Sequence, residues 1–346
     1  MSRRIPAEFE KQEAVLLAFP HNGNDWPGKF NAIQWAFVEF VRKITTYQKV
    51  MLVVKNQKHK SLVIGKFIQA SLDLNKIDFI IQQTNRSWMR DSGPIIVFNE
   101  TGERTALRFN FNGWAKYENH AKDKRIPDAV ASHLGISLTK VMHNGNFVVM
   151  EGGAIDYNGR GTLITTKECL LHPTIQVRNP GYDQFDYEQV FKTYLGIDQV
   201  IWLANGIEGD DTHGHVDDIC RFINPHTVIL AEEKNARDIN HQILEENRER
   251  LENLYLQDGE KLEVIRMPMP GRIDFDNMRL PASYVNFLII NHAVLVPTFN
   301  DKNDYLALGI MRELMPDRDV IGISAIDLIW GLGTLHCLSH EIPAFE

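Results

Sequence analysis

The residues that best indicate the fold are AVLLAF (14–19), NAIQWAFVEFVRKITTY (31–47) and VMLVV (50–54). The first and third segments are short and rich in Val, Leu and Phe, as β-strands are. The middle segment is longer and spaces its apolar residues as a helix with one buried face does. A strand, a helix and a strand in succession indicate an α/β fold.

The same alternation continues along the chain. A charged, amphipathic pattern predicts a surface helix over 236–257. No linker rich in Gly and Ser, low-complexity tract or long block of charge divides the sequence. We therefore expect one α/β domain that spans residues 1–346. The other segments that read as strands are IDFIIQ (77–82), PIIVF (94–98), ALRFNF (106–111), FVVM (147–150), VIWLA (200–204), TVILA (227–231) and YVNFLII (284–290).

Composition excludes several classes of protein. The 346 residues are 44% hydrophobic and 24% charged, which is ordinary for a globular protein and excludes a disordered or fibrous chain. The formal net charge is −8 and is spread along the sequence. Such a surface repels nucleic acid and anionic membranes, so we expect neither as a partner. The same charge mildly favours a cationic ligand.

The cysteines and the N-terminus bear on the compartment. Three cysteines, Cys169, Cys220 and Cys337, are too few and too odd in number for a disulfide framework, and they fit a reducing compartment. Residues 1–20 carry three glutamates ahead of or within their short apolar run, which a secretory signal does not tolerate. No run of about 18 apolar residues occurs that could cross a membrane. We expect a cytoplasmic protein.

One candidate nucleophile is Cys337 in GLGTLHCLSHEIP (331–343). Glycines beside a thiol permit the close approach of a substrate and of backbone N–H groups. A free cysteine is, however, most often a small buried apolar residue, and the segment by itself leaves both interpretations open.

A second candidate segment is GDDTHGHVDDICRF (209–222). If a strand begins at His213, then His213, His215 and Asp217 point to one face, because side chains alternate along a strand. That face could place a catalytic histidine beside a carboxylate, or two histidines and an aspartate around zinc or iron. The segment is also compatible with a solvated acidic turn.

Two further segments offer carboxylates. In NRSWMRDSGPIIVF (85–98), Asp91 precedes a Ser-Gly-Pro turn and could simply cap it, whereas Trp88 is large for a polar loop. In EGGAIDYNGRGTLITT (151–166), a strand, a glycine turn and a returning strand are expected. Glu151 could line a pocket there or lie at the edge of a hairpin.

Together these segments supply a thiol, an imidazole and several carboxylates. That set suits the hydrolysis of a guanidine. Two carboxylates can accept paired N–H bonds from the planar guanidinium cation and hold it near a thiolate. A histidine can then protonate the departing nitrogen and later deprotonate water.

The sequence resembles the agmatine deiminase / bacterial-type peptidylarginine deiminase family of the guanidine-modifying superfamily. The resemblance implies a five-bladed, pseudo-symmetric α/β propeller, or pentein, of strand–strand–helix–strand units around a central pocket. It also implies hydrolysis of a guanidine to a urea with release of ammonia, without metal or other cofactor. The matching segments are IPAEFEKQEAVLLAFP (5–20), NDW (24–26), WMRDSGP (88–94), EGGAIDYNGRGTLITTKECLL (151–171), RNPG (178–181), GDDTHGHVDDICRF (209–222), ASYVNFLIINHAVLVPTFNDKNDYLA (282–307) and GLGTLHCLSHEIP (331–343).

The resemblance implies roles for four residues in bond-making and in holding the reacting group. Cys337 matches the nucleophile and His215 matches the general acid and base. Asp91 and Asp217 match the two carboxylates that hold the guanidinium.

The resemblance also implies a set of residues that contact the substrate or support the site. Trp88 is similar to a tryptophan that walls the pocket, and Asn286 is expected to line it too. Asp210 or Glu208 is expected to face the far end of the substrate, and Glu151 is expected to support the catalytic histidine.

The last motif departs from the family pattern at three positions. Leu332 stands where the family usually has the middle of three glycines. Ser339 and His340 stand where Thr and Gln are usual. Ser339 keeps the hydroxyl, whereas His340 introduces a titratable ring that could alter substrate preference or the pH profile.

The expected reaction is the conversion of agmatine to N-carbamoylputrescine and ammonia through a covalent thiouronium on Cys337. The acidic run GIEGDD (206–211) favours the ammonium end of agmatine. Deimination of free or peptidyl arginine to citrulline is the first alternative. More remote alternatives are a metal-dependent amidohydrolase that uses His213, His215 and Asp217, and a non-catalytic binding protein. A homodimer is the commonest assembly for a soluble chain.

Overall fold

The computed structural model describes residues 3–345 and has a mixed α/β fold. Within that range, five sheets repeat one pattern of pairing. A central strand pairs antiparallel with one neighbour and parallel with the strand that follows it in the chain. Parallel neighbours need a crossover, and helices supply it.

Four of these sheets are built from consecutive strands. Their crossovers are α4 (Ile126–Leu134), α5 (Lys167–Leu171) with α6 (Gln184–Leu195), α7 (Ile239–Leu251) and α8 (Asp304–Leu314). The strands are β4 (Ile95–Phe98), β5 (Arg104–Arg108) and β6 (Ser137–Lys140); β9 (Ile155–Tyr157), β10 (Thr162–Thr166) and β11 (Gln199–Leu203); β12 (Cys220–Phe222), β13 (Thr227–Glu232) and β14 (Glu263–Pro268); β17 (Leu288–Ile290), β18 (Ala293–Thr298) and β19 (Asp319–Ser324).

The fifth sheet joins the two ends of the chain. Its order is β20-β1-β2-β3, and Leu16 of β1 lies opposite His340 of β20. The C-terminal strand therefore takes the antiparallel place that a preceding strand takes in the other sheets. The elements are β1 (Gln12–Ala18), α1 (Phe30–Tyr47), β2 (Lys49–Val54), α2 (Gln57–Gln69), β3 (Ile77–Ile81) and β20 (Ser339–Pro343).

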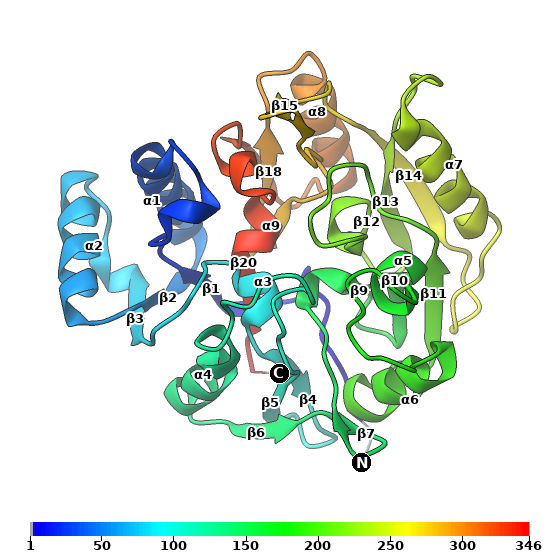
Figure 1. Ribbon diagram of the computed structural model, residues 1–346, viewed down its shortest axis with the longest axis horizontal. Coiled ribbons are helices and arrows are strands. Elements are labelled where there is room, and N and C mark those ends of the chain that lie inside the picture. The colour runs from blue at the N-terminus through cyan, green and yellow to red at the C-terminus, as the bar shows by residue number, and fades with distance from the viewer. Residues whose placement is uncertain (1–2, 346) are drawn as a thin grey trace.

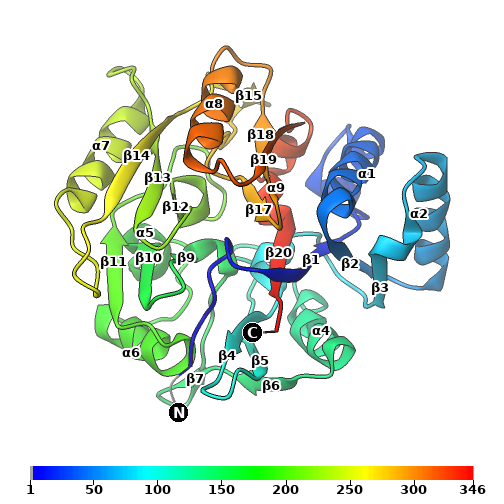
Figure 2. The ribbon, with the colours of Figure 1, turned by 180° about the vertical axis from the view of Figure 1, so that it is seen from behind.

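Figures 1 and 2 show the five sheets arranged around the middle of the molecule, with the crossover helices on the outside. Two one-turn helices, α3 (Met89–Ser92) and α9 (Leu335–Leu338), lie near the middle and contact each other. The remaining strands form two short hairpins: β7 (Met142–His143) with β8 (Asn146–Phe147), and β15 (Asp274–Phe275) with β16 (Met278–Arg279).

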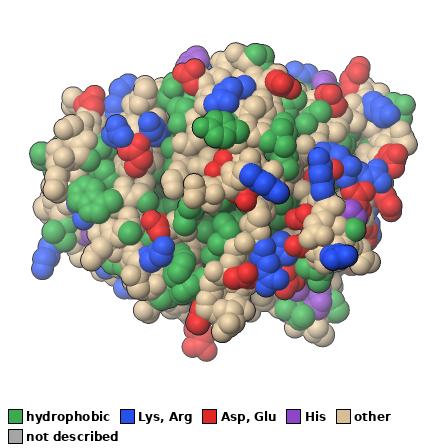
Figure 3. Space-filling view, turned by 90° about the horizontal axis from the view of Figure 1, so that it is seen from above, with side chains coloured by type: hydrophobic (Ala, Val, Ile, Leu, Met, Phe, Trp, Pro, Cys, Tyr) green, Lys and Arg blue, Asp and Glu red, His purple; other side chains and the backbone are tan. Residues whose placement is uncertain are grey.

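The inner strands are buried on both faces. In β1, Val15 and Leu17 belong to one apolar cluster, whereas Leu16 and its alternate neighbours belong to another. This burial explains why the strands read as continuous apolar runs rather than as alternating ones. On the face drawn in Figure 3, acidic and basic side chains are interspersed.

Most of the predicted elements are confirmed, and several predicted limits are wrong. The expected strand at 284–290 contains only Leu288–Ile290, and the one at 147–150 contains only Phe147. The strand expected at 106–111 ends at Arg108, and the helix expected at 236–257 spans Ile239–Leu251. Among the helices of the described residues, none has the length and apolar character needed to cross a bilayer.

Candidate active site

A cavity of about 210 Å³ lies where segments from distant parts of the chain meet. Trp88, Asp91 and Cys337 all line it, as the sequence interpretation expects of pocket residues. Trp88 precedes α3 and Cys337 lies in α9, so the contact between these two short helices brings the residues together.

Cys337 is held by a network around Asn286. The Asn286 side-chain amide donates to the Cys337 Sγ at 3.1 Å. Its Oδ1 accepts from the Thr334 hydroxyl at 2.7 Å and from the backbone N–H of His336 at 3.1 Å. Asn286, like His215 and Asp217, is not among the residues that line the cavity, although its amide contacts the thiol that does. Asn286 fixes the helix that carries this thiol.

Asp91 does not cap its turn. One of its oxygens accepts from the Trp114 indole N–H at 2.9 Å and the other from the Gly153 N–H at 3.1 Å. The carboxylate is therefore held pointing into the centre of the site. Burial, together with the nearby charges of Asp217 and Glu151, raises the pKa of Asp91 to about 6, although His215 opposes the shift.

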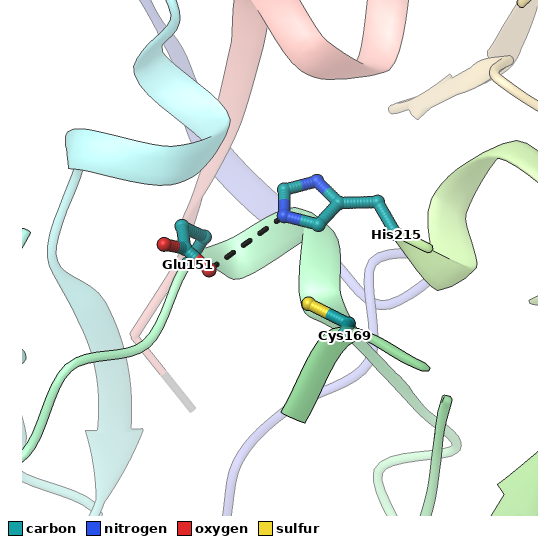
Figure 4. Close-up of side chains that lie close together, drawn as sticks. All are labelled: Glu151, Cys169 and His215. Atoms are coloured by element: carbon teal, nitrogen blue, oxygen red, sulfur yellow. Dashed lines mark ion pairs between the residues drawn. The ribbon is translucent and has the colours of Figure 1, made fainter. Parts of the chain in front are cut away.

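His215 is surrounded by carboxylates. Its Nδ1 lies 3.8 Å from Asp91 Oδ1 and 4.0 Å from Asp217 Oδ1, and its Nε2 lies 3.7 Å from Glu151 Oε2. Figure 4 shows that Glu151 and the Cys169 sulfur lie near the ring. Burial lowers the pKa of His215, but the Asp91 charge and the nearby Cys169 and Glu151 side chains outweigh it and raise the pKa well above the usual range.

Glu151 is anchored from behind, as expected of a residue that supports the histidine. The Arg178 Nε donates to both of its oxygens at 3.2 Å, and both side chains are fully buried. Burial raises the pKa of Glu151, but Arg178 and His215 outweigh it, so the pKa is lower than usual. Gly153 packs directly on this group, because a Cβ there would lie 2.5 Å from His215 Nδ1.

Asp217 is completely buried and is oriented by His336. The His336 Nδ1 lies 2.7 Å from Asp217 Oδ2, and the Cys337 Sγ lies 3.7 Å from the same oxygen. Asp217 Oδ1 accepts no hydrogen bond from the residues that the structure describes. Burial raises the pKa of Asp217, but His336 and His215 lower it below the usual value.

His336 connects Asp217 to Glu8, which lies on the far side of the ring. Its Nε2 lies 2.8 Å from Glu8 Oε2, and Glu8 also pairs with Arg90 at 3.1 Å and Arg221 at 2.9 Å. The sequence interpretation did not identify Glu8 or His336. The HC pair at 336–337 was the available signal, since neighbours of a nucleophile often hold its partners.

The strand expected from His213 is wrong. His213 has a φ of +66°, residues Val216–Asp218 form a 3-10 turn, and β12 begins only at Cys220. The Asp210 carboxylate causes this by accepting the backbone N–H groups of Gly214 and His215 at 2.8 and 2.9 Å.

The metal-ligand set proposed on that strand is therefore not formed. The His213 Nδ1 lies 3.5 Å from Glu168, and its ring packs against His172, away from His215. Among residues 3–345, the groups whose donor atoms lie close enough for one ion are Glu151 with Cys169 and His215, and Asp217 with Asp218 and Cys337.

The far wall of the cavity differs from the expectation. Asp210 and Glu208 do not line the cavity, whereas the next acidic residue, Asp211, does. Asp211 accepts from the Tyr117 hydroxyl at 2.8 Å and pairs with Lys116. Adjacent aspartates on a loop cannot be told apart in a sequence, since the loop conformation decides which one points inward.

A second ion pair lies on the same wall. Arg86 and Asp25 both line the cavity, and Arg86 Nη1 lies 2.7 Å from Asp25 Oδ1. Burial raises the pKa of Asp25 to about 6, against the effect of Arg86. Arg86 also lies over the Tyr117 ring, 4.2 Å from its centroid. The sequence interpretation did not identify this pair.

The departures in the last motif lie in different surroundings. His340 is buried behind α3 with its Nδ1 3.1 Å from the Arg90 carbonyl oxygen, and it does not line the cavity. Ser339 uses the hydroxyl it shares with threonine to donate to the Leu335 carbonyl at 2.7 Å. Leu332 lines the cavity, and its backbone φ is +69°.

The chain is similar to several known proteins along nearly its whole length. Agmatine deiminase of Pseudomonas syringae pv. syringae is 32% identical over 362 residues, which cover 98% of this chain and 95% of that protein. Agmatine deiminase of Enterococcus faecalis has a solved structure with a TM-score of 0.89 and 28% identity, over 99% of this chain and 96% of that one.

A cysteine-to-serine variant of C. jejuni agmatine deiminase, solved with substrate bound, has a TM-score of 0.87 and 28% identity over 99% and 97% of the two chains. The model of the Porphyromonas-type peptidyl-arginine deiminase family matches residues 4–343. The predicted resemblance is thus confirmed over nearly the whole sequence, and the chain belongs to the Porphyromonas-type peptidyl-arginine deiminase family.

Proposed function

We propose that this protein hydrolyses agmatine to N-carbamoylputrescine and ammonia. The observation that carries the proposal is the grouping of a thiol, an imidazole and two buried carboxylates. Cys337 and Asp91 line the cavity. Behind them, His215 lies 3.8 Å from Asp91 and 4.0 Å from Asp217, and Asp217 lies 3.7 Å from the thiol. The relatives described above that are named agmatine deiminases support the choice of substrate.

The guanidinium binds between Asp91 and Asp217. Asp217 Oδ1 is free to accept N–H bonds, and Asp91 is fixed by Trp114 and Gly153. Planar, paired hydrogen bonds to carboxylates are strong and set the orientation of the cation. Trp88 closes one side of the cavity and excludes water from the reacting carbon.

Substrate binding activates the nucleophile. Burial and the charges of Asp217, Asp218 and Asp91 raise the pKa of the Cys337 thiol well above its usual range, although Asn286 opposes this. A guanidinium between those carboxylates offsets their charge and favours the thiolate. The thiol proton passes to a neighbouring carboxylate, because His215 is already protonated. The thiol is therefore inert until a cation of the right kind arrives.

The reaction then proceeds in two halves. The thiolate sulfur forms a bond to the guanidinium carbon, and the tetrahedral adduct breaks its bond to one terminal nitrogen as His215 protonates it. Ammonia leaves and a thiouronium remains on Cys337. His215, now neutral, takes a proton from water, whose oxygen attacks the same carbon. The adduct breaks its carbon–sulfur bond, the thiolate regains its proton from the carboxylate, and the ureido product loses its hydroxyl proton to water or to the released ammonia.

Glu151 and Arg178 prepare His215 for this role. The carboxylate beside Nε2 keeps the ring oriented with Nδ1 toward Asp91 and Asp217. The raised pKa of His215 supplies the proton for the leaving group, because the ring enters the cycle protonated. The Arg178 pair in turn prevents Glu151 from taking that proton.

Asp211 and Asp25 bind the ammonium end of agmatine at the far wall. Free arginine is the second candidate, because Arg86 and Lys116 bring two cations to the same wall and could pair with an α-carboxylate. Asp211 and Asp25 already compensate those two cations, which favours a substrate without a carboxylate.

We also propose that the five sheets are repeats of a five-bladed propeller and that the chain is one domain. The common pattern of pairing supports the repeats, and the β20–β1 pairing supports closure of the ring. The residues that line the cavity come from segments near both ends and the middle of the chain, so a shorter piece of the chain would not contain the whole site.

A comparative turnover assay tests the function. The purified protein is given agmatine, arginine and a C-terminal arginine peptide, each with and without a chelator, beside Cys337→Ala. We expect ammonia and ureido product chiefly from agmatine, unaffected by the chelator and absent in the variant. Absence of turnover with every guanidine would refute the proposal, and loss of activity with the chelator would favour a metal-dependent reaction.

A further inference from the structure

Leu332 occupies a backbone conformation that suits glycine. Its φ is +69°, in the left-handed region that L side chains adopt at a cost. Its neighbours must be glycines for steric reasons, because a Cβ at 331 would lie 2.5 Å from Trp26 Nε1 and one at 333 would lie 2.9 Å from Trp88. A leucine between them adds strain that a third glycine would avoid, so its side chain needs another explanation.

The position of the Leu332 side chain supplies that explanation. Leu332 lines the cavity that contains Cys337 and also lines a larger neighbouring groove of about 800 Å³. Among the residues that line the cavity or the groove, only Asp211 and Met278 also line both. Leu332, Met278 and Asp211 therefore form the partition between the catalytic cavity and the groove.

The groove has a chemistry of its own. Arg237, Arg272 and Arg279 lie along it, together with Glu208 and Asp238. Arg279 pairs with Asp238 at 2.7 Å and the exposed Arg272 pairs with Asp274 at 2.8 Å, whereas the exposed Arg237 has no ion pair among the described residues. Arginine side chains along a polar groove suit a carboxylate. A guanidine that extends past the partition with a carboxylate would reach these cations.

The partition is also firmly held. Met278 belongs to the β15–β16 hairpin, and Phe275 of that hairpin packs on Trp330, with ring centroids 3.4 Å apart. Trp330 immediately precedes the segment 331–333. The hairpin and the strained loop thus support each other across the mouth of the cavity.

We propose that Leu332, with Met278, determines substrate length by closing the catalytic cavity off from the arginine-lined groove. The inference rests on the proposed hydrolysis of guanidines at Cys337. Agmatine fits on the catalytic side of the partition, whereas a guanidine with a bulky, carboxylate-bearing end is excluded by the leucine side chain and not by repulsive charge.

Two substitutions of Leu332 distinguish the effect of its side chain on substrate choice from the effect of its backbone strain on stability. Leu332→Ala removes most of the side chain and keeps the left-handed strain, whereas Leu332→Gly removes both. We expect kcat/KM for glycyl-arginine, relative to that for agmatine, to rise at least about tenfold in both variants, since hydrophobic wall contacts typically give about 10- to 200-fold discrimination. We also expect Leu332→Gly to have a midpoint of thermal unfolding about 1–3 °C above that of Leu332→Ala.

Ser71 provides the matched control. It has a φ of +56° and lies outside the cavity and the groove. Ser71→Gly should also be more stable than Ser71→Ala, but neither should change the ratio of the two substrates. If the wild-type protein hydrolyses agmatine and the ratio stays unchanged in both Leu332 variants, the partition is refuted while the proposed function survives. If the wild-type protein hydrolyses no guanidine, the proposed function fails and the partition fails with it.

Discussion

The most exacting test of the site geometry is Gly153→Ala, which adds one methyl group. A Cβ at this position would lie 2.5 Å from His215 Nδ1 and 3.1 Å from both Asp217 Oδ2 and Asp91 Oδ1. The backbone at Gly153 is not in the left-handed region, so alanine is acceptable there apart from these contacts. The substitution therefore disturbs three proposed catalytic groups at once without removing any of them.

The size of the effect follows from these distances. Carbon and nitrogen atoms in contact are normally about 3.5 Å apart, so the His215 ring must move by about 1 Å. A displacement of about 1 Å at a reacting centre typically costs about 10²-fold in rate. The cost in stability should be smaller, about 1–3 kcal/mol, as for an extra methyl in a packed core. We expect a fall in kcat of about 10²-fold in a protein that remains folded.

The assay measures kcat and KM for agmatine by ammonia release, with thermal unfolding as the test of folding. Gly65→Ala is the matched control, because a Cβ at Gly65 meets no atom within 4 Å and Gly65 lies inside α2. Alanine in place of glycine in a helix should stabilise the protein by up to about 1 kcal/mol and leave kcat unchanged. A folded Gly153→Ala protein with kcat within about threefold of wild type would refute the arrangement of His215, Asp91 and Asp217 as the reacting centre.

Three further predictions follow from the same geometry. Cys337→Ala should lose essentially all turnover of agmatine. It should also form no covalent adduct, which mass spectrometry would detect in wild-type protein after the reaction is quenched with acid. Cys220→Ala, at another buried cysteine, should keep both the turnover and the adduct. The kcat/KM for agmatine should fall about tenfold per pH unit below about pH 6, because Asp91 becomes protonated there and loses the charge that attracts the cation. If the pH profile of Asp91→Asn shows the same fall at acid pH, this assignment is contradicted. His336→Gln should raise the KM for agmatine and lower kcat by at least about tenfold, because a glutamine amide can replace the ring Nε2 beside Glu8 but not the Nδ1 that lies 2.7 Å from Asp217. His340→Gln, at a buried ring outside the cavity, should leave both within about twofold, and equal effects would show that His336 only packs.

The sequence predicted the reacting groups better than it predicted their supports. The structure brings Cys337, His215, Asp91 and Asp217 together, as the proposed reaction requires, and Cys337 and Asp91 line the cavity. Glu8 and His336 were not identified, because their part is to contact Asp217 and the arginines around it across the interior. Such contacts join residues 82 to 328 positions apart and leave no local pattern.

Local loop conformation accounts for the errors at the far wall and in the histidine segment. Asp210 and Asp211 are chemically equal in the sequence, yet one binds backbone N–H groups and the other faces the cavity. The same Asp210 contacts turn His213 away from His215 and remove the expected metal-ligand set. Hydrogen bonds within a loop of six residues decide these directions, and hydrophobic periodicity carries no information about them.

The sequence by itself determined the α/β class and the succession of strands and helices, because hydrophobic periodicity is a local property. Its resemblance to a known family, and not the local pattern, singled out the proposed thiol, imidazole and carboxylates. Only the tertiary structure decided that β20 pairs with β1, that α3 and α9 meet, and that Asp211, Asp25 and Arg86 form the far wall. The physical reason is that burial, pKa and the direction of a side chain depend on neighbours brought together by packing. The strained backbone at Leu332 was likewise decided by the tertiary structure, since only the structure shows the positive φ and the two cavities that this residue lines.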